Sequence, residues 1–426
     1  MITRGLLADI LGKPKRVVES QISKGKLPSE EISANDRNYF SLEQLKLIPA
    51  AGFMFSNEWH EFVQTEPEKE FTLIELFAGC GGLALGLEMA GFKSLLVNEL
   101  DKDACATLRT NRPDWNVVEG DVSDIDFKSY KGKVDLLTGG FPCQAFSYAG
   151  KKLGFEDTRG TLFYEFARAI NEIRPKVFLA ENVKGLVSHN KGKTLETITE
   201  VTNELGYVLV SSEVLRAIFY RVPQKRERIF LVGIKKEFFD FVTYDLPSKF
   251  PGVFTMRDAL KAGKLFNEDV PPSDGQEYPN RKREIMEHVP EGGYWRDLPD
   301  ELQREYMKGS YLLGGGKTGI ARRLSWDEPS LTLVCTPAQG QTERCHPEET
   351  RPLTTREYAR IQTFPDTWEF CGPRNSIYKQ IGNAVPVNLG YAKGLSLVRL
   401  LNAIENIDYN VKIKRPVEPK QISMQF

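Results

Sequence analysis

A strand, a glycine-rich turn and a helix follow one another at residues 71–90, and this order constrains the fold more than any other feature. Phe71 to Phe77 is an apolar run of strand length, Gly79 to Gly82 (GCGG) forms the turn, and Leu83 to Ala90 has the pattern of an amphipathic helix. Such a unit typically opens a doubly wound α/β sheet, and its glycines let a ligand approach the backbone. The spacing differs from G-x-G-x-x-G, so the turn does not imply pyrophosphate binding.

Acidic residues follow the next two predicted strands. Glu99 ends the strand Ser94 to Asn98, and Asp121 follows the strand Trp115 to Glu119. An acid about 20 residues past the turn can accept both ribose hydroxyls, and Asp121 can accept from an adenine amino group. A solvated carboxylate or a helix cap is the alternative for either acid alone. With the glycine turn, the two predict a nucleoside pocket without a phosphate cradle, which suits S-adenosyl-L-methionine better than NAD or ATP.

A cysteine stands just past the central predicted strand. Residues 134–137 are apolar, two glycines follow, and then come Phe141, Pro142, Cys143 and Gln144. Pro142 fixes its own φ and biases Phe141 towards extended geometry, so the peptide leading into Cys143 is stiff. A small buried hydrophobe is the ordinary reading of a single cysteine. The proline, the polar Gln144 and the Gly-, Ser- and Lys-containing loop that follows favour a nucleophile.

Two further strand ends carry polar side chains. The strand at 177–180 ends in Glu181, and crossover connections of a parallel sheet place it on the same edge as Cys143. Glu181 can protonate or hydrogen-bond a heterocycle, or it can cap the next helix. Arg226 and Arg228 alternate before the strand at 229–233, so we expect both on one side, reading an anion or a carbonyl oxygen. A solvated charge run is the alternative.

The residues before 71 read as a separate unit and a linker. Within residues 1–60, two short helices, a KGKLP turn and a β-like return resemble the winged helix-turn-helix of MerR-like regulators. A helical cap packed on the main domain is the alternative. Residues 57–70 are acidic and contain a proline, so we expect a linker there. The second helix would present four polar side chains to DNA: Lys15, Arg16, Gln21 and Lys24.

The alternation of predicted strands and helices stops at residue 241 and resumes near residue 350. Residues 241–349 mix Pro, Gly, Trp and both charges, and they predict an irregular second domain. Residues 70–240 and 350–410 then form one α/β domain. Within its second part we expect a helix from Thr354 to Gln362, and a final long helix opened by Ile381 to Asn388.

Composition sets broad limits on the class of protein. The net charge of −1 gives no overall basic signature, although DNA binding needs only a local patch. Six scattered cysteines form no CxxC pair, so we expect no metal site. No apolar run reaches membrane-spanning length and no signal peptide opens the chain, so we expect a cytoplasmic protein with free thiols.

Six stretches in order resemble the motifs of DNA (cytosine-5)-methyltransferases of bacterial restriction–modification systems. The resemblance covers roughly residues 70–405. The stretches are ELFAGCGGLALGLEMAGF, GGFPCQAFSYAGKK, ENVKGL, QKRERIFLVG, RPLTTREYARIQTFPD and IGNAVPVNLG. The resemblance implies a Rossmann-like methyltransferase domain that uses S-adenosyl-L-methionine, with residues 241–349 as a target-recognition domain.

The resemblance also assigns roles to residues. Cys143 is the expected nucleophile, while Glu181 and Arg228, with Arg226 behind, hold a flipped cytosine. The expected S-adenosyl-L-methionine site is lined by Phe77, Gly79, Gly81, Glu99, Asp121, Pro142, Asn383 and Val385. The residues expected to contact DNA are Gln144, Ser147, Lys151 and Thr332. The loop from Ser147 to Lys152 is the expected lid.

The implied partners are double-stranded DNA and a restriction endonuclease that acts on the same site without necessarily binding this chain. We expect a monomer, with dimerisation through residues 1–60 left open. Three alternatives stand beside this reading. They are an RNA (tRNA) cytosine-5 methyltransferase, an added role of residues 1–60 in repressing the operon, and an inactive scaffold that binds S-adenosyl-L-methionine. The recognised DNA sequence cannot be read from side-chain spacing.

Overall fold

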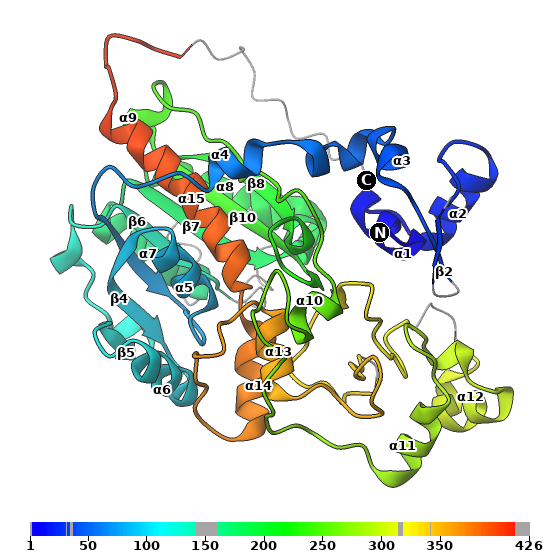
Figure 1. Ribbon diagram of the computed structural model, residues 1–426. Helices are drawn as coiled ribbons and strands as arrows, with labels where there is room; N and C mark the ends of the chain where they lie inside the picture. Colours follow the sequence, from blue (N-terminus) through cyan, green and yellow to red (C-terminus); the bar gives the residue numbers. More distant parts are fainter. Residues whose placement is uncertain are drawn as a thin grey trace.

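A seven-stranded sheet forms the centre of the computed structural model, which describes residues 2–30, 32–34, 37–141, 161–313, 318–340 and 342–413 (Figure 1). The strand order is β5-β4-β3-β6-β7-β10-β8. Only β10 runs antiparallel to its neighbours, β7 and β8. The strands are β3 (Phe71–Leu76), β4 (Phe92–Glu99), β5 (Val117–Glu119), β6 (Leu136–Gly139), β7 (Val177–Val183), β8 (Tyr207–Arg216) and β10 (Glu227–Lys235). The predicted doubly wound α/β fold is confirmed.

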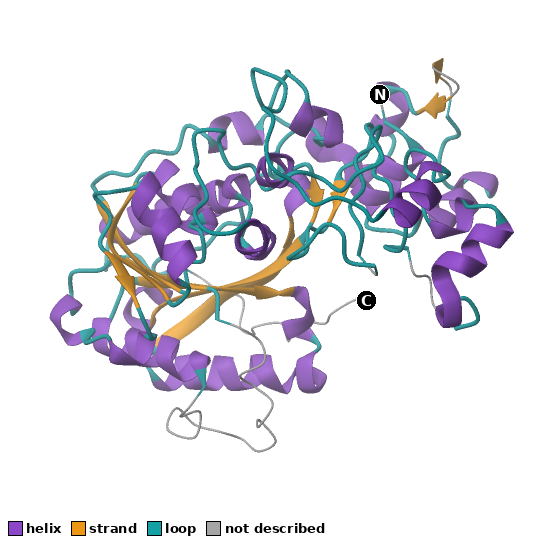
Figure 2. Cartoon of the chain, turned by 90° about the horizontal axis from the view of Figure 1, so that it is seen from below, coloured by secondary structure: helices purple, strands orange, loops and turns teal. Residues whose placement is uncertain are grey.

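Helices cover both faces of this sheet (Figure 2). On one face, α5 (Gly82–Met89) and α15 (Val387–Glu405) share a core with Phe71 and Phe230 of the sheet. On the other, α7 (Leu162–Ile173) and α8 (Lys193–Glu204) bury their apolar sides. Helix α6 (Lys102–Asn111) follows β4. Both faces of the sheet are thus covered, as parallel strands built from continuous apolar runs require.

Local sequence explains where the helix α7 begins and which side it buries. The Thr161 hydroxyl accepts a hydrogen bond from the backbone N–H of Tyr164 at 3.1 Å, a standard N-cap. Phe163, Phe166 and Ile170 then recur at helical spacing, and each is at most 1% exposed. Helix α7 is therefore fixed against β6 and β7, the strands whose ends carry the predicted chemistry.

The backbones of α5 and of the segment around α15 make close contact because small residues line both. A Cβ on Gly82 would lie 2.2 Å from the carbonyl oxygen of Val385, and one on Gly86 would lie 2.5 Å from that of Val387. A Cβ on Gly394 would lie 2.6 Å from the Cβ of Ala90. The first helix after the glycine turn and the last helix of the domain therefore pack as one block.

The N-terminal residues form a small unit of short helices and one hairpin with its own core. Its elements are α1 (Arg4–Leu11), α2 (Lys15–Ser23), the antiparallel pair β1 (Ile32–Ala34) and β2 (Arg37–Tyr39), and α3 (Leu42–Lys46). Leu7, Val18, Phe40 and Leu45 are buried together. Two helices, a hairpin and a third helix follow one another in the predicted order.

The predicted linker at residues 57–70 is wrong. After η1 (Pro49–Phe55), α4 (Glu58–Phe62) packs on the main domain. Trp59 is 4% exposed and Phe62 is 1% exposed, and both belong to the core beneath α15. The acidic residues and Pro67 suggested a solvent-exposed linker. Trp59 and Phe62 have i, i+3 spacing, however, so they lie on one face of a helix, and that face is buried.

The region from 241 to 349 contains short helices among its loops. Among its described residues the α-helices are α10 (Met256–Leu260), α11 (Asn280–Glu287) and α12 (Asp300–Met307), and α9 (Lys236–Phe239) directly precedes the region. A separate apolar cluster includes Met286, Trp295 and Cys345. Strand β11 (Ser330–Leu331) returns to the main domain and pairs in parallel with β9 (Gln224–Lys225).

The C-terminal part contains a helix that the sequence reading merged with the next one. α13 (Thr355–Ile361) lies where a helix was expected. Ile381 to Asn383 then close α14 (Arg374–Asn383), and α15 starts after Pro386. Pro386 has no N–H and favours a helix start over a helix interior, so the expectation of one helix opened by these residues is corrected. In the described part of the chain, no helix has the length and apolarity needed to span a bilayer.

Lys393 of α15 is an unusual core residue, because its side chain is fully buried. Its ammonium donates to the hydroxyl of Tyr244 and lies 5.4 Å from the ring centroid of Phe230. Burial lowers the pKa of Lys393 to about 7, which Glu213 only partly opposes. The folded state therefore favours the neutral amine, whereas in the unfolded chain lysine stays protonated up to about pH 10.4.

We predict that the free energy of unfolding rises between pH 7 and pH 10 because the unfolded chain then binds the proton that folded Lys393 has lost. Lys393→Met should remove this component, which is on the order of a few kcal/mol. Urea unfolding at several pH values measures it. Lys412→Met, which changes an exposed lysine, is the control, and an unchanged pH slope in Lys393→Met would refute the prediction.

Candidate functional site

The glycine turn after β3 has a left-handed backbone at three residues, which the two glycines adopt readily and Phe77 does not. Phe77 has φ of 58°, Gly79 of 57° and Gly81 of 86°. Gly81 caps α5, and a Cβ on Gly79 would meet no atom within 4 Å. The space beside the backbone at Gly79 is therefore open to a ligand.

Glu99 fixes that turn to the end of β4. One carboxylate oxygen, Oε2, accepts from the N–H of Gly79 at 2.7 Å. The other, Oε1, accepts from the N–H groups of Leu100 at 2.8 Å and Asp101 at 2.9 Å. An ionised carboxylate offers about four acceptor positions, so Oε2 still has one for a ligand hydroxyl.

Asp121 lies at the neighbouring strand end. Asn98 donates from Nδ2 to the carbonyl oxygens of Val118 at 3.1 Å and Gly120 at 3.0 Å, which holds the end of β5 beside β4. The Asp121 carboxylate is exposed and accepts from the N–H of Ser123 at 2.8 Å, which lowers the pKa of Asp121. The structure thus brings the turn, Glu99 and Asp121 to one sheet edge.

Asn383 and Val385 reach this edge from the other end of the domain. Asn383 is exposed at the C-terminus of α14, and its Oδ1 accepts from the Cys335 thiol at 3.3 Å. The carbonyl of Val385 packs on Gly82. An approachable glycine turn, a fixed carboxylate and a polar amide suit a nucleoside with free ribose hydroxyls, so these residues fit S-adenosyl-L-methionine.

Glu181 and Arg228 form a buried ion pair at the ends of β7 and β10. Nε of Arg228 lies 2.8 Å from Oε1 of Glu181, and each side chain is 13% exposed. Burial raises the pKa of Glu181, although Arg228 and Arg226 act in the opposite direction. A Cβ on Gly140 would lie 3.1 Å from Oε2 of Glu181, so the chain that leads to Cys143 passes beside this acid.

Asn182 is a site residue that the sequence reading did not single out. It is 5% exposed and donates from Nδ2 to the carbonyl oxygen of Phe141 at 2.8 Å. This contact fixes the last described residue before the predicted nucleophile. The signal was its place in ENVKGL, next to Glu181. Five predicted site residues lie outside the described residues: Pro142, Cys143, Gln144, Ser147 and Lys151.

Arg226 has different partners from Arg228. It is 1% exposed and donates to the carbonyl oxygens of Gly382 at 3.1 Å and Asn383 at 3.2 Å. Burial, reinforced by Arg228, lowers the pKa of Arg226 to about 9, so it stays a cation at neutral pH. Arg226 therefore stabilises the C-terminal carbonyls of α14, while Arg228 contacts the acid.

Thr332 lies where β11 meets β9. Its hydroxyl donates to the carbonyl oxygen of Lys225 at 2.7 Å. Gln224 is fully buried beside it, and its Oε1 accepts from the N–H of Leu333 at 3.0 Å. Nε2 of Gln224 donates to Gln362 at 2.8 Å, and Gln362 donates to the carbonyl oxygen of Ile381 at 2.6 Å. The sequence reading missed this glutamine pair, because a buried amide pair gives no periodic signal.

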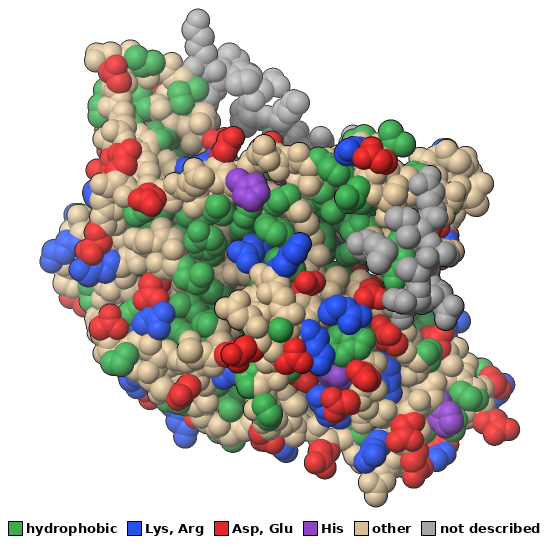
Figure 3. Space-filling view, viewed as in Figure 1, with side chains coloured by type: hydrophobic (Ala, Val, Ile, Leu, Met, Phe, Trp, Pro, Cys, Tyr) green, Lys and Arg blue, Asp and Glu red, His purple; other side chains and the backbone are tan. Residues whose placement is uncertain are grey.

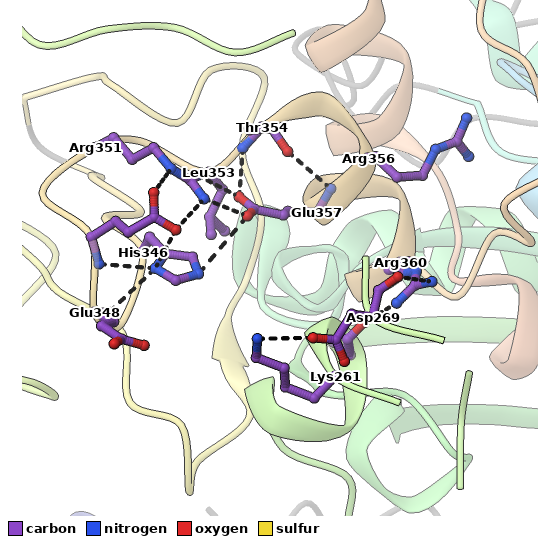
Figure 4. A network of polar contacts seen from close by, with 12 residues as sticks. Lys261, Asp269, His346, Glu348, Arg351, Leu353, Thr354, Arg356, Glu357 and Arg360 are labelled. Atoms are coloured by element: carbon purple, nitrogen blue, oxygen red, sulfur yellow. Dashed lines mark hydrogen bonds and ion pairs between the residues drawn. The ribbon is translucent and has the colours of Figure 1, made fainter. Parts of the chain in front are cut away.

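A groove of about 1090 Å³ lies elsewhere, where the region 241–349 joins α13. Figure 4 shows its polar wall, in which Arg351 donates to both carboxylate oxygens of Glu357 at 2.8 Å. His346 accepts at Nδ1 from the N–H of Glu349 at 3.0 Å. None of the predicted catalytic or cofactor residues that the structure describes lines this groove.

Charge on one face of the molecule is mixed. Figure 3 shows basic and acidic side chains interspersed there, without one continuous band of Lys and Arg. Such a band is the expected footprint of a surface that binds DNA phosphates. Within the residues that the structure describes, no cluster of three or more His, Cys, Asp or Glu side chains is arranged to hold a metal ion.

Comparison with known proteins gives one consistent result. Residues 71–399 match the family model described as C-5 cytosine-specific DNA methylase. The chain is 60% identical over 398 residues to Type II methyltransferase M.Eco47II of Escherichia coli, covering 93% of this chain and 95% of that one. It is 61% identical to M.PspPI of Psychrobacter sp. (strain TA137), covering 93% and 96%.

Solved structures agree on the fold. A prophage-encoded E. coli protein, crystallised as a candidate DNA modification methyltransferase, is 27% identical with a TM-score of 0.56. The match covers 78% of this chain and all of that one. A Spodoptera frugiperda DNMT2 variant, 16% identical with a TM-score of 0.50 over 79% of this chain and all of that one, shows the fold alone.

We predict that Glu99→Gln lowers the affinity for S-adenosyl-L-methionine by about tenfold or more. An amide has one acceptor oxygen, so its NH₂ must face either Gly79 or the pair Leu100 and Asp101. Calorimetric titration measures the affinity. Asp126→Asn, which changes an exposed carboxylate that accepts from Lys128 N–H, is the control, and equal affinities in all three proteins would contradict the prediction.

Proposed function

The chain belongs to the C-5 cytosine-specific DNA methylase family, and from this premise we propose how its residues methylate DNA. It transfers a methyl group from S-adenosyl-L-methionine to C5 of cytosine in double-stranded DNA, as the methyltransferase of a restriction–modification system. The observation that carries the mechanism is the buried pair of Glu181 and Arg228, beside the chain that leads to Cys143.

The cofactor-binding residues act by holding and orienting the donor. Glu99 would accept from a ribose hydroxyl at Oε2, and Asp121 would accept from the adenine amino group. The turn from Phe77 to Gly81 leaves space for the ligand beside the backbone. Pro142, Asn383 and Val385 complete the proposed site. S-adenosyl-L-methionine supplies an electrophilic methyl group on a sulfonium.

Cys143 makes the target carbon reactive. Cytosine C5 is too weak a nucleophile to take the methyl group unaided. The Cys143 thiolate adds to C6 and forms an S–C6 bond, which turns the ring into an enamine with electron density at C5. After C5 has taken the methyl group, a base removes the C5 proton and the S–C6 bond breaks. We assign no side chain to that base; water can serve.

Glu181 neutralises the charge that develops on the ring. Thiolate addition pushes negative charge towards N3 and O2, and a protonated Glu181 donates to N3. Its raised pKa supports this role. Arg228 donates to O2 and holds Glu181 in place, while Arg226 holds the chain before Arg228 to the C-terminal carbonyls of α14.

DNA contacts come from the loop after Cys143 and from β11. A thiol cannot reach C6 inside a stacked duplex, so the cytosine must be flipped out. Gln144, Ser147 and Lys151 would contact DNA there, and Thr332 would lie near the flipped base. Residues 241–349 would read the sequence. We further propose a cytoplasmic monomer whose partner endonuclease acts on the same site without binding to it.

RNA is the alternative substrate, and an additional role in operator binding is open for residues 1–60. The exposed basic side chains of α2, Lys15 and Arg16 among them, favour a nucleic-acid contact by that unit. Labelled S-adenosyl-L-methionine offered with unmethylated genomic DNA or with tRNA separates the substrates. Bisulfite sequencing of the DNA product should show one short motif methylated at C5, and labelling of tRNA alone would overturn the DNA assignment.

We predict that Cys143→Ala and Cys143→Ser abolish methylation while S-adenosyl-L-methionine still binds. Both variants lack the thiolate that activates C5. Methyl incorporation and calorimetric titration measure the two properties on the same preparations. Cys371→Ser is the control, since it changes a half-buried cysteine beside Thr110 of α6. A Cys143→Ala enzyme with near-normal turnover would refute the covalent mechanism.

We predict an alkaline loss of activity that depends on Glu181. Methyl transfer needs the protonated acid, so the rate should fall as pH rises through its raised pKa. Glu181→Gln should be slower by about 10²-fold or more and lose this alkaline limb. Single-turnover rates across pH measure it. Glu227→Gln, which changes a half-buried neighbour paired with Lys184, should keep the limb, and a Glu181→Gln profile that parallels wild type would rule out the role.

A further inference from the structure

We propose that the N-terminal unit is a positioning element of the target-base site, and that Asp9 of α1 holds strand β9 in place through Lys225. This inference rests on the proposed function, because it assigns the unit a task in the same reaction. Figure 1 shows the unit beside the main domain, and the contacts at α1 join the two.

Lys225 stands between two carboxylates from distant parts of the chain. Its Nζ lies 2.8 Å from Oδ2 of Asp9 and 3.0 Å from Oε2 of Glu328. The three side chains are 18–24% exposed. Burial alone would lower the pKa of Lys225, but the carboxylates outweigh it and raise that pKa. Removing one partner of such a shielded group leaves the others poorly compensated.

Lys225 lies on β9, a strand too short to be stable through its backbone pairing alone. The ladder between β9 and β11 has two residue pairs, Ser330 with Gln224 and Leu331 with Lys225. A ladder this short is marginal without side-chain support. Yet the Lys225 carbonyl accepts from the Thr332 hydroxyl at 2.7 Å, and the next residue is Arg226. A shift of Lys225 would therefore move residues proposed to face the cytosine.

A second contact fixes the C-terminal end of α1. Arg216, the last residue of β8, donates to the carbonyl oxygens of Asp9 and Ile10, the latter at 3.2 Å. These carbonyls lie in the last turn of α1, where a cation is favourable. A Cβ on Gly5 would lie 2.1 Å from Oε1 of Glu328, and one on Gly12 would lie 3.2 Å from Nη1 of Arg216.

Gly5 and Gly12, near the two ends of α1, thus allow the helix to pack closely against Glu328 and Arg216. The pairing register places Arg216 opposite Glu227, one residue before Arg228. The same helix therefore contacts β8, which pairs with β10, through Arg216, and β9 through Lys225. A freely tethered regulatory unit would need neither contact.

Asp9→Asn tests the proposal, since it keeps the shape of the side chain and removes its charge. We expect the single-turnover methylation rate to fall by about tenfold or more, because small displacements of a supporting residue are costly to catalysis. Affinity for S-adenosyl-L-methionine should stay near wild type. Amide hydrogen exchange should become faster at residues 223–226 and 330–333. Lys225→Arg, which keeps a cation between both carboxylates, should retain most of the rate.

Glu30→Gln is the matched control. It breaks an ion pair inside the unit, in which Oε1 of Glu30 lies 2.7 Å from Nε of Arg4, without touching β9. Its methylation rate should stay within about twofold of wild type. The proposal is overturned if Asp9→Asn keeps both its rate and its exchange pattern, or if Glu30→Gln slows the enzyme equally. Wild-type protein that methylates no DNA would count against the proposed function alone, and the exchange pattern would still decide the role of Asp9.

Discussion

Backbone contact between α5 and the start of α15 is the constraint on which the rest of the structure depends. The carbonyl of Val385 occupies the space that a side chain on Gly82 would need, and that of Val387 does the same at Gly86. The turn that would hold the nucleoside and the segment that carries Asn383 are therefore parts of one rigid block. Because α15 also covers the sheet and α4, the same contact determines how much of the apolar core is shielded from water.

Above this block, polar side chains at the strand ends hold one another in place. Glu99 binds the glycine turn, Asn182 binds the residue before Pro142, and Arg226 binds the last carbonyls of α14. Each bond runs between segments far apart in sequence. Buried polar groups of this kind are costly unless satisfied, so together they specify one arrangement of the site.

Much of this arrangement can be predicted from the sequence, and the reasons are local. Continuous apolar runs mark β3 and β10, the glycine turn marks the start of α5, and acids directly after strands mark Glu99 and Glu181. The periodicity of the apolar residues predicts the strands, and parallel strands end on one edge of a sheet. Together these two rules predict that Glu99 and Glu181 lie on the same edge.

The rest depends on partners that no local pattern reveals. Trp59 and Phe62 look like part of an acidic linker until α15 is placed above them. Arg226 and Arg228 alternate like a pair, yet one contacts carbonyl groups of α14 and the other contacts Glu181. Lys225 reads as a member of a charge run, and only the fold shows that Asp9, more than 200 residues earlier, lies beside it.

During translation, Gly82 is synthesised well before Val385, the residue that it contacts in the folded protein. About 300 residues lie between them, which is roughly 15–60 s of synthesis. During that interval the turn and every residue proposed to touch cytosine have left the ribosome, but nothing yet supports the turn from the side of α15. A nascent chain that stops before Asn383 would carry the chemical groups of the enzyme without the platform that orients them. Activity should therefore appear late in synthesis, when α15 closes on α5.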